Sequence, residues 1–204
     1  MSALPPSRRS FVRCAAVLGA GLALDACSGS HPAPPPYTGE LRTVALAAAL
    51  ENQAVNAYRS VQAALRSGRL GPAVPALDAF VRTAMDHHAQ HAVTWNAILR
   101  DARRPAVTGT PLAGHARLMD AIGAATSVAG IVAVVQRLEN QAAQTHLAAA
   151  GSLAGPGPSV LAAATIAPVE AMHAAALGYV LSGRSAVGGF LGTAAAVPVT
   201  ELTA

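Results

Sequence analysis

A chain of 204 residues that is 52% hydrophobic and only 3% aromatic has room for one domain with a sizeable core, but not comfortably for two. Alanine is the dominant residue and the best helix former, so we expect an all-α protein. The formal net charge is +4, but there is no lysine and the arginines are scattered, which leaves neither a nucleic-acid-binding patch nor a polybasic membrane patch.

The first 27 residues have the pattern of an export signal. A charged start precedes an apolar run, Cys14 to Leu24, which is too short to span a membrane comfortably. Arg8-Arg9 followed by Phe-Val-Arg closely resembles the twin-arginine signal, whose route carries folded proteins. A generic secretory leader with a chance pair of arginines is the alternative. We therefore expect export by the twin-arginine route.

The end of this signal resembles a lipobox. In Leu24-Asp25-Ala26-Cys27 the cysteine would be diacylated and become the mature N-terminus, although Asp25 departs from the small or apolar residue usual there. Cleavage without lipid and retention of an uncleaved anchor are the alternatives. The proline-rich residues 28–39 predict an extended tether. We expect a protein of the cell envelope, anchored by lipid on the outer side of the cytoplasmic membrane.

Only two cysteines occur, Cys14 in the signal and Cys27 at the lipidation site. The body after them therefore has no disulfide and no thiol nucleophile. Such a body can fold completely in a reducing cytoplasm, which agrees with export in the folded state.

Residues 40–182 predict a four-helix bundle. The expected helices run from Glu40 to about Ser67, from about Pro75 to Asp101, from about Ser127 to Ala150, and from Ser159, a candidate cap, to about Leu181. Residues 103–125, rich in glycine and proline, form a long connection with a short helix around residues 115–122. Short, long and short links are typical of a bundle with one crossover between helices two and three. The apolar tail, residues 183–204, predicts no element.

A five-residue repeat relates the first and third expected helices. Leu50-Glu51-Asn52-Gln53-Ala54 recurs as Leu138-Glu139-Asn140-Gln141-Ala142, and each copy lies midway along the first helix of a helical pair. The repeat predicts two related halves and a pseudo-twofold axis, with equivalent residues facing one another across the core.

Glutamate and histidine occur at metal-ligand spacing on all four expected helices: Glu51, His88 and His91, Glu139, and Glu170 and His173. Residues three apart lie on one helix face, so each such pair can reach the same ion. Apolar neighbours place the glutamates near the apolar face, where a lone carboxylate is costly. A shared metal site accounts for the whole set. Salt bridges from Arg59 or Arg137 to the two repeat glutamates are the alternative.

This arrangement resembles the ferritin-like superfamily, in which helices one and three each supply a Glu and helices two and four each supply Glu-x-x-His. Residues 159–173 also look very like the fourth helix of secreted bacterial ferritin-like domain proteins. The resemblance covers roughly residues 40–181 and implies a ferritin-like bundle with iron, or manganese or zinc, at its centre. The ligands it implies are Glu51, His91, Glu139, Glu170 and His173.

The sequence departs from that pattern at His88, where the family has a glutamate. Loss of a carboxylate removes a negative charge, and an imidazole does not bridge two ions as a carboxylate does. We therefore expect weaker support for a diferric centre than for a mixed or single-metal site. His87 and His146 are nearby candidates, the latter as a group supporting a ligand. Three further residues are interpreted as structural or surface residues: Tyr58, Asp86 and Trp95.

Two functions compete at this point. One is an exported, metal-dependent oxidoreductase or metal-handling protein whose metal reacts with oxygen or peroxide. The other is a non-catalytic envelope lipoprotein with a degenerate, metal-free ferritin-like core. The sequence identifies no partner besides the membrane, and a homodimer stays open.

Overall fold

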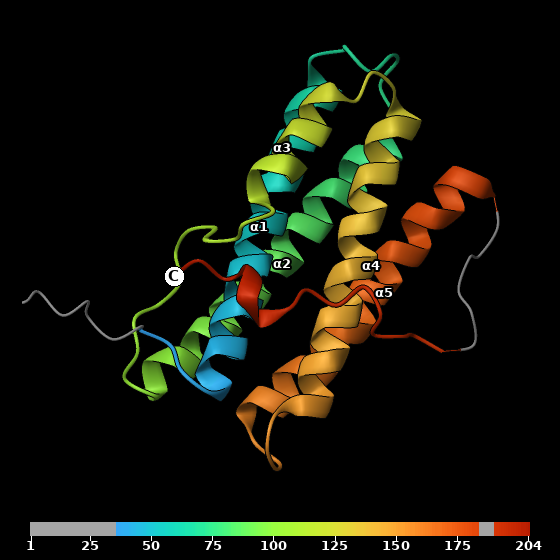
Figure 1. The fold of residues 1–204 in the computed structure, drawn as a ribbon. Coiled ribbons are helices and arrows are strands. Elements are labelled where there is room, and N and C mark those ends of the chain that lie inside the picture. Colours follow the sequence, from blue (N-terminus) through green and yellow to red (C-terminus); the bar gives the residue numbers. More distant parts are fainter. Residues whose placement is uncertain (1–35, 184–189) are drawn as a thin grey trace, which may run out of the picture. The chain divides into compact units, whose positions relative to one another are not determined.

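The computed structural model describes residues 36–183 and 190–204, and this part of the chain is all-helical (Figure 1). The expected signal, the lipidation site Cys27 and the tether up to residue 35 lie outside the described residues. The elements are α1 (Glu40–Arg66), α2 (Pro75–Asp101), α3 (His115–Ala124), α4 (Val128–Ser152), α5 (Pro158–Ser182) and a short 3-10 helix, η1 (Val199–Glu201). The all-α prediction and the four long helices are confirmed.

Local signals account for where the helices begin and end. Ser127 caps α4, because its hydroxyl accepts a hydrogen bond from the Gly130 amide at 3.1 Å. Proline occupies the first turn of α2 and of α5, where its missing N–H costs nothing. The predicted cap at Ser159 is wrong, since α5 begins at Pro158 with Gly157 in the capping position. Gly183 ends α5 in the left-handed conformation, at φ 64°.

The bundle is built from two helical hairpins. α1 packs mainly on α2, and α4 packs mainly on α5, as the repeat predicts. Short links join the helices within each hairpin, and the long crossover between the hairpins carries α3. α3 lies against α1 and α4 (Figure 1).

Two separate apolar clusters fill the bundle, one toward each end. One contains Leu46, Trp95, Leu99, Ala149 and Ile166 among its buried residues. The other contains Tyr58, Val81, Ile131, Val135 and Leu177. Each of the four long helices passes from one cluster to the other at its glutamate or histidine positions. The polar residues therefore form a buried layer between the two apolar clusters, which shield this layer from water.

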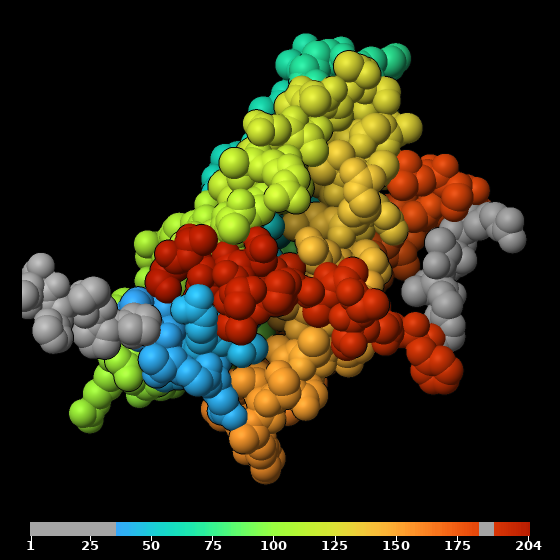
Figure 2. All heavy atoms as spheres, in the orientation of Figure 1, coloured from blue at the N-terminus to red at the C-terminus, as the bar shows by residue number. Residues whose placement is uncertain are grey.

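The end of the chain packs on the bundle, although the sequence predicted no element there. Arg42 of α1 donates to the carbonyl of Leu202 at 2.8 Å, and the Thr145 hydroxyl of α4 accepts from the amide of Val197 at 2.9 Å. Leu202 is buried and pairs with Leu112 of the crossover. Figure 2 shows this last segment, in red, lying across α1 and α4.

Among the described helices, α5 alone is long and apolar enough to cross a membrane by length and composition. In the bundle, 44% of the apolar stretch is buried. Its inward side carries Glu170 and His173, which are both buried. In this structure α5 is therefore a core helix.

Candidate metal centre

The polar layer brings together all six residues that the sequence singled out as metal ligands. Five of them are buried, and His91 is nearly so. They come from α1, α2, α4 and α5, so every long helix contributes. Their oxygen and nitrogen atoms form two groups, each compact enough to surround one ion.

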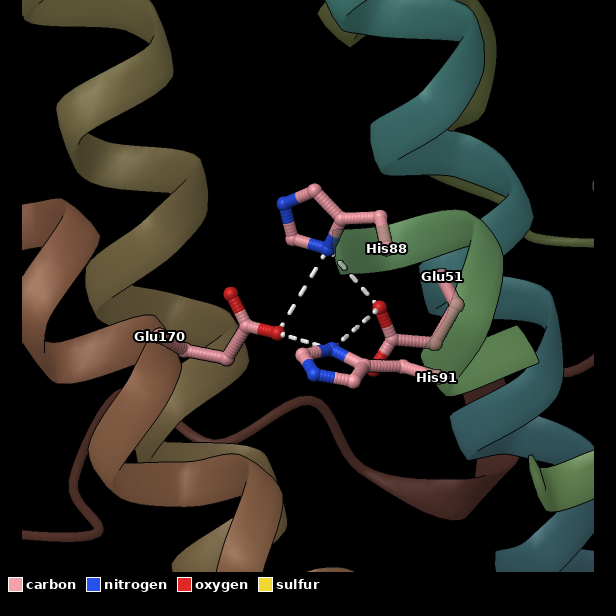
Figure 3. A group of neighbouring side chains, drawn as sticks. All are labelled: Glu51, His88, His91 and Glu170. Carbon is pink, nitrogen blue, oxygen red and sulfur yellow. Dashed lines mark hydrogen bonds and ion pairs between the residues drawn. The ribbon is translucent and has the colours of Figure 1, made fainter. Parts of the chain in front are cut away.

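The first group consists of Glu51, His88, His91 and Glu170, which point toward one another in Figure 3. Nδ1 of His88 lies 2.8 Å from Oε2 of Glu51, and Nδ1 of His91 lies 2.8 Å from Oε1 of Glu170. The two crossed distances are longer, at 3.5 Å from His88 to Glu170 and 3.6 Å from His91 to Glu51. All four ligand atoms lie within 4.8 Å of one another.

The second group consists of His88, Glu139, Glu170 and His173. Nε2 of His88 lies 3.1 Å from Oε1 of Glu139. Nδ1 of His173 lies 3.2 Å from Oε2 of Glu170 and 3.5 Å from Oε2 of Glu139. His88 and Glu170 thus belong to both groups, and each uses different atoms for each contact.

Tyr58 supports the second group, a role that the sequence analysis did not assign. Its buried hydroxyl donates a hydrogen bond to Oε1 of Glu139, and its ring stacks on His88 with centroids 5.6 Å apart. One signal in the sequence pointed to it: Tyr58 follows Glu51 by seven residues, which is two helical turns along the same face. Asp86 is exposed, as expected of a surface residue.

Two further histidines, His87 and His146, each contact one of the six candidate ligands. His87 Nδ1 lies 3.0 Å from His173 Nε2, with the two rings stacked 5.2 Å apart. His146 Nε2 lies 2.8 Å from Oε1 of Glu51, beside the first group. Trp95 stacks on His146 and is fully buried, so it is a core residue that packs on a neighbour of the centre.

The arginine alternative for the repeat glutamates is wrong. Arg59 is bonded to Asn56 on the exposed side of α1, and Arg137 is exposed. Within the described residues, every ion pair of Glu51 and Glu139 is made with a histidine.

The buried glutamates and histidines of the layer shift one another's pKa values toward the charged forms. Burial alone would raise the pKa of Glu51 and of Glu139, but the surrounding imidazoles hold both pKa values well below the ordinary value. Burial opposes protonation of His88, yet the carboxylates of Glu139 and Glu170 raise its pKa well above the ordinary value. Burial opposes protonation of His91 and His173 as well. Hydrogen bonds to Glu170 and Glu51 nevertheless raise the pKa of His91 to about 9, and hydrogen bonds to Glu139 and Glu170 raise the pKa of His173 to about 9.

The residues present fit a transition-metal ion. Carboxylate oxygen and imidazole nitrogen are the donors that iron, manganese and zinc accept. Each group offers two carboxylate oxygens and two imidazole nitrogens, all within 4.8 Å of one another. Four donor atoms at this separation are close enough to bind one ion in common.

A family model described as a ferritin-like domain matches residues 71–183, just over half of the chain. The matched region contains α2, α3, α4 and α5, and so all of the ligand candidates except Glu51. No curated protein and no solved structure matches the chain.

Proposed function

This chain belongs to the ferritin-like domain family, and from that premise we propose that it binds one or two transition-metal ions in the bundle core. Iron is the first candidate, with manganese or zinc as alternatives. The proposed ligands are Glu51, His88, His91, Glu139, Glu170 and His173.

One observation carries this proposal: three carboxylates converge with three imidazoles in a layer that apolar clusters seal at both ends. A buried carboxylate must be protonated, paired or bound to metal, because transfer of a charge out of water is costly. The close approach of four donor atoms in each group, all within 4.8 Å of one another, favours the third of these states.

We further propose that the centre works in oxidation–reduction. A bound iron or manganese ion would supply reactivity toward oxygen or peroxide. The chain's own residues would set the surroundings: Tyr58 orients Glu139 through its hydrogen bond, and His87 holds the ring of His173 in place. With both cysteines located before residue 36, the body has no thiolate centre to relay electrons, so the reductant must come from outside.

The test is metal analysis of the full chain purified after folding in the cytoplasm. We expect one or two ions per chain in the wild type and loss of metal in Glu170→Ala and His173→Ala. Met172→Ala is the matched control, because Met172 adjoins His173 on α5 but is 56% exposed. A metal-free protein whose thermal midpoint does not respond to added Fe, Mn or Zn would sink the proposal.

One observation favours the competing function, a metal-free envelope lipoprotein. His88 alone reaches three carboxylates, at 2.8 Å, 3.1 Å and 3.5 Å, so a protonated imidazole balances part of the buried charge without an ion. The same metal analysis separates the two functions, since only the metal-binding protein gains thermal stability from added ions.

We also propose that the protein is exported by the twin-arginine route and anchored in the envelope through Cys27; both features lie outside the described residues. Replacement of Arg8 and Arg9 by lysine is expected to retain the protein in the cytoplasm, as measured by cell fractionation. Cys27→Ala is expected to release the exported protein from membranes. Normal export of the lysine variant would contradict the first claim, and continued membrane attachment of the alanine variant the second.

A further inference from the structure

We propose that His88 joins two metal ions, one at each ring nitrogen, so that the ions lie on opposite sides of a single imidazole. The proposal deepens the proposed function and rests on it. An imidazole does not bridge two ions as a carboxylate does, but its two ring nitrogens can each bind a separate ion.

The two nitrogens of His88 face different groups. Nδ1 lies 2.8 Å from Glu51 Oε2 and 3.5 Å from Glu170 Oε1, in the first group. Nε2 lies 3.1 Å from Glu139 Oε1, in the second group. The lone pairs of the two nitrogens diverge in the plane of the ring, so one ion cannot take both. An ion in each group would find one nitrogen of His88 among its donors.

Glu170 spans the same two groups from the opposite hairpin. Its Oε1 lies 2.8 Å from His91 Nδ1, in the first group, and its Oε2 lies 3.2 Å from His173 Nδ1, in the second. His88 and Glu170 are each followed three residues later by a histidine, on α2 and α5 respectively. In the family pattern both positions are glutamates. His88 therefore reaches both groups, as a glutamate at this position would, but through two ring nitrogens instead of two carboxylate oxygens.

The ring of His88 is held in the orientation that a bridge requires. It is fully buried, and Tyr58 stacks on it at an interplanar angle of 27°. The rings of His91 and His173 meet it edge-on, with centroids 6.0 Å and 5.6 Å away. Close packing of this kind prevents the ring from turning one nitrogen away from its group.

Charge balance favours two divalent ions. An imidazole bound at both nitrogens has lost its ring protons to solvent and carries one negative charge. Together with the carboxylates of Glu51, Glu139 and Glu170, it supplies four negative charges, which match two divalent cations. Each ion then has two carboxylate oxygens and two imidazole nitrogens as donors, a set that suits zinc and, with open positions, iron or manganese.

The test locates the ions in crystals of the full chain loaded with Zn²⁺, by anomalous scattering. We expect two peaks, one beside each nitrogen of His88. In His88→Glu, which restores the family's carboxylate, the peaks are expected to approach the spacing of about 3.5–4 Å that is typical of two-metal sites. His115→Gln on α3, outside the centre, is the control and is expected to leave the wild-type spacing unchanged.

A spectroscopic measurement covers the case in which a variant fails to fold. Wild-type protein loaded with two Cu²⁺ ions is expected to show a weakened paramagnetic resonance signal, because the shared ring couples the two spins. One peak, or two peaks with His88 bound through a single nitrogen and a full-intensity Cu²⁺ signal, would overturn the bridge and leave metal binding intact. Absence of any bound metal would instead overturn the proposed function.

Discussion

The two halves of the bundle use the same repeat differently. Glu51 and Glu139 both face the polar layer and are equally buried. Their neighbours diverge. The Asn52 side chain donates to the carbonyls of Val107 and Gly109 and so holds the crossover. The Asn140 side chain instead lines a cavity of about 610 Å³. The repeat therefore preserves the inward glutamate. The contacts of the asparagine that follows it depend on which segment packs against each half.

The two groups of the centre differ in the same way. The second group is enclosed: Tyr58 bonds to Glu139, His87 lies against His173, and the His173 side chain is 3% exposed. The first group is more open, with His91 13% exposed. His91 is therefore the most solvent-accessible of the six candidate ligands.

Glu170→Ala is expected to have the largest effect, because Glu170 alone among the carboxylates serves both groups. Both ions should be lost, whereas Glu51→Ala and Glu139→Ala should each cost the ion of one group. Removal of one partner from buried ion pairs lowers the free energy of unfolding by about 3–5 kcal/mol. Metal analysis and denaturant unfolding measure the two effects. Equal metal loss in all three variants would break the division into two groups.

The pH dependence of stability should reverse sign on metal loading. The pKa of His91 and His173 is raised from 6.5 to about 9 in the folded protein, so between these values the folded state holds protons that the unfolded chain has released. Without metal, stability is therefore full below pH 6.5 and falls as the pH rises toward 9. With metal, stability should rise over the same range, because ligands must lose protons to bind.

Thermal unfolding at several pH values, with and without Zn²⁺, measures both slopes. His91→Gln and His173→Gln should each remove part of the metal-free slope, and by similar amounts, since their pKa values agree. If only one of the two substitutions reduced the pH dependence of metal-free stability, His91 and His173 would not contribute equally to it.

Tyr58→Phe should lower the metal affinity of the second group and leave that of the first group unchanged. The change removes the hydroxyl that bonds to Glu139 and leaves the stacked ring on His88. Loss of a bond that orients a ligand weakens metal binding by about tenfold or more. Calorimetric titration with Zn²⁺ should show this loss at one of two sites. His146→Gln should weaken the other site, because His146 adjoins Glu51.

Arg42→Ala should have the smallest effect on the centre. Its guanidinium holds the final segment through the carbonyl of Leu202 and contacts none of the six candidate ligands in the described part of the chain. A hydrogen bond from a charged group contributes about 1.5–3 kcal/mol. Limited proteolysis should cut residues 190–204 faster in this variant, with metal content unchanged. Loss of metal on this substitution would mean that the docked tail helps to shape the centre.

The sequence by itself determined the helices and the membership of the polar layer. Proline and glycine at the helix ends, together with long alanine-rich runs, predicted α1, α2, α4 and α5 because these signals act within a few residues. Spacing of three residues placed His88 with His91, and Glu170 with His173, on common faces for the same reason.

Only the tertiary structure decided how those residues meet. The contact of Tyr58 with Glu139 joins positions 81 apart, and the division of His88 between two carboxylate groups depends on how each helix is rotated about its axis. The tail packs on the bundle through backbone groups and the buried Leu202, and its hydrogen-bond partners Arg42 and Thr145 lie far from it in the sequence. Helix rotation and packing arise from the whole core at once, so local spacing predicts which residues gather but not which atoms face each other.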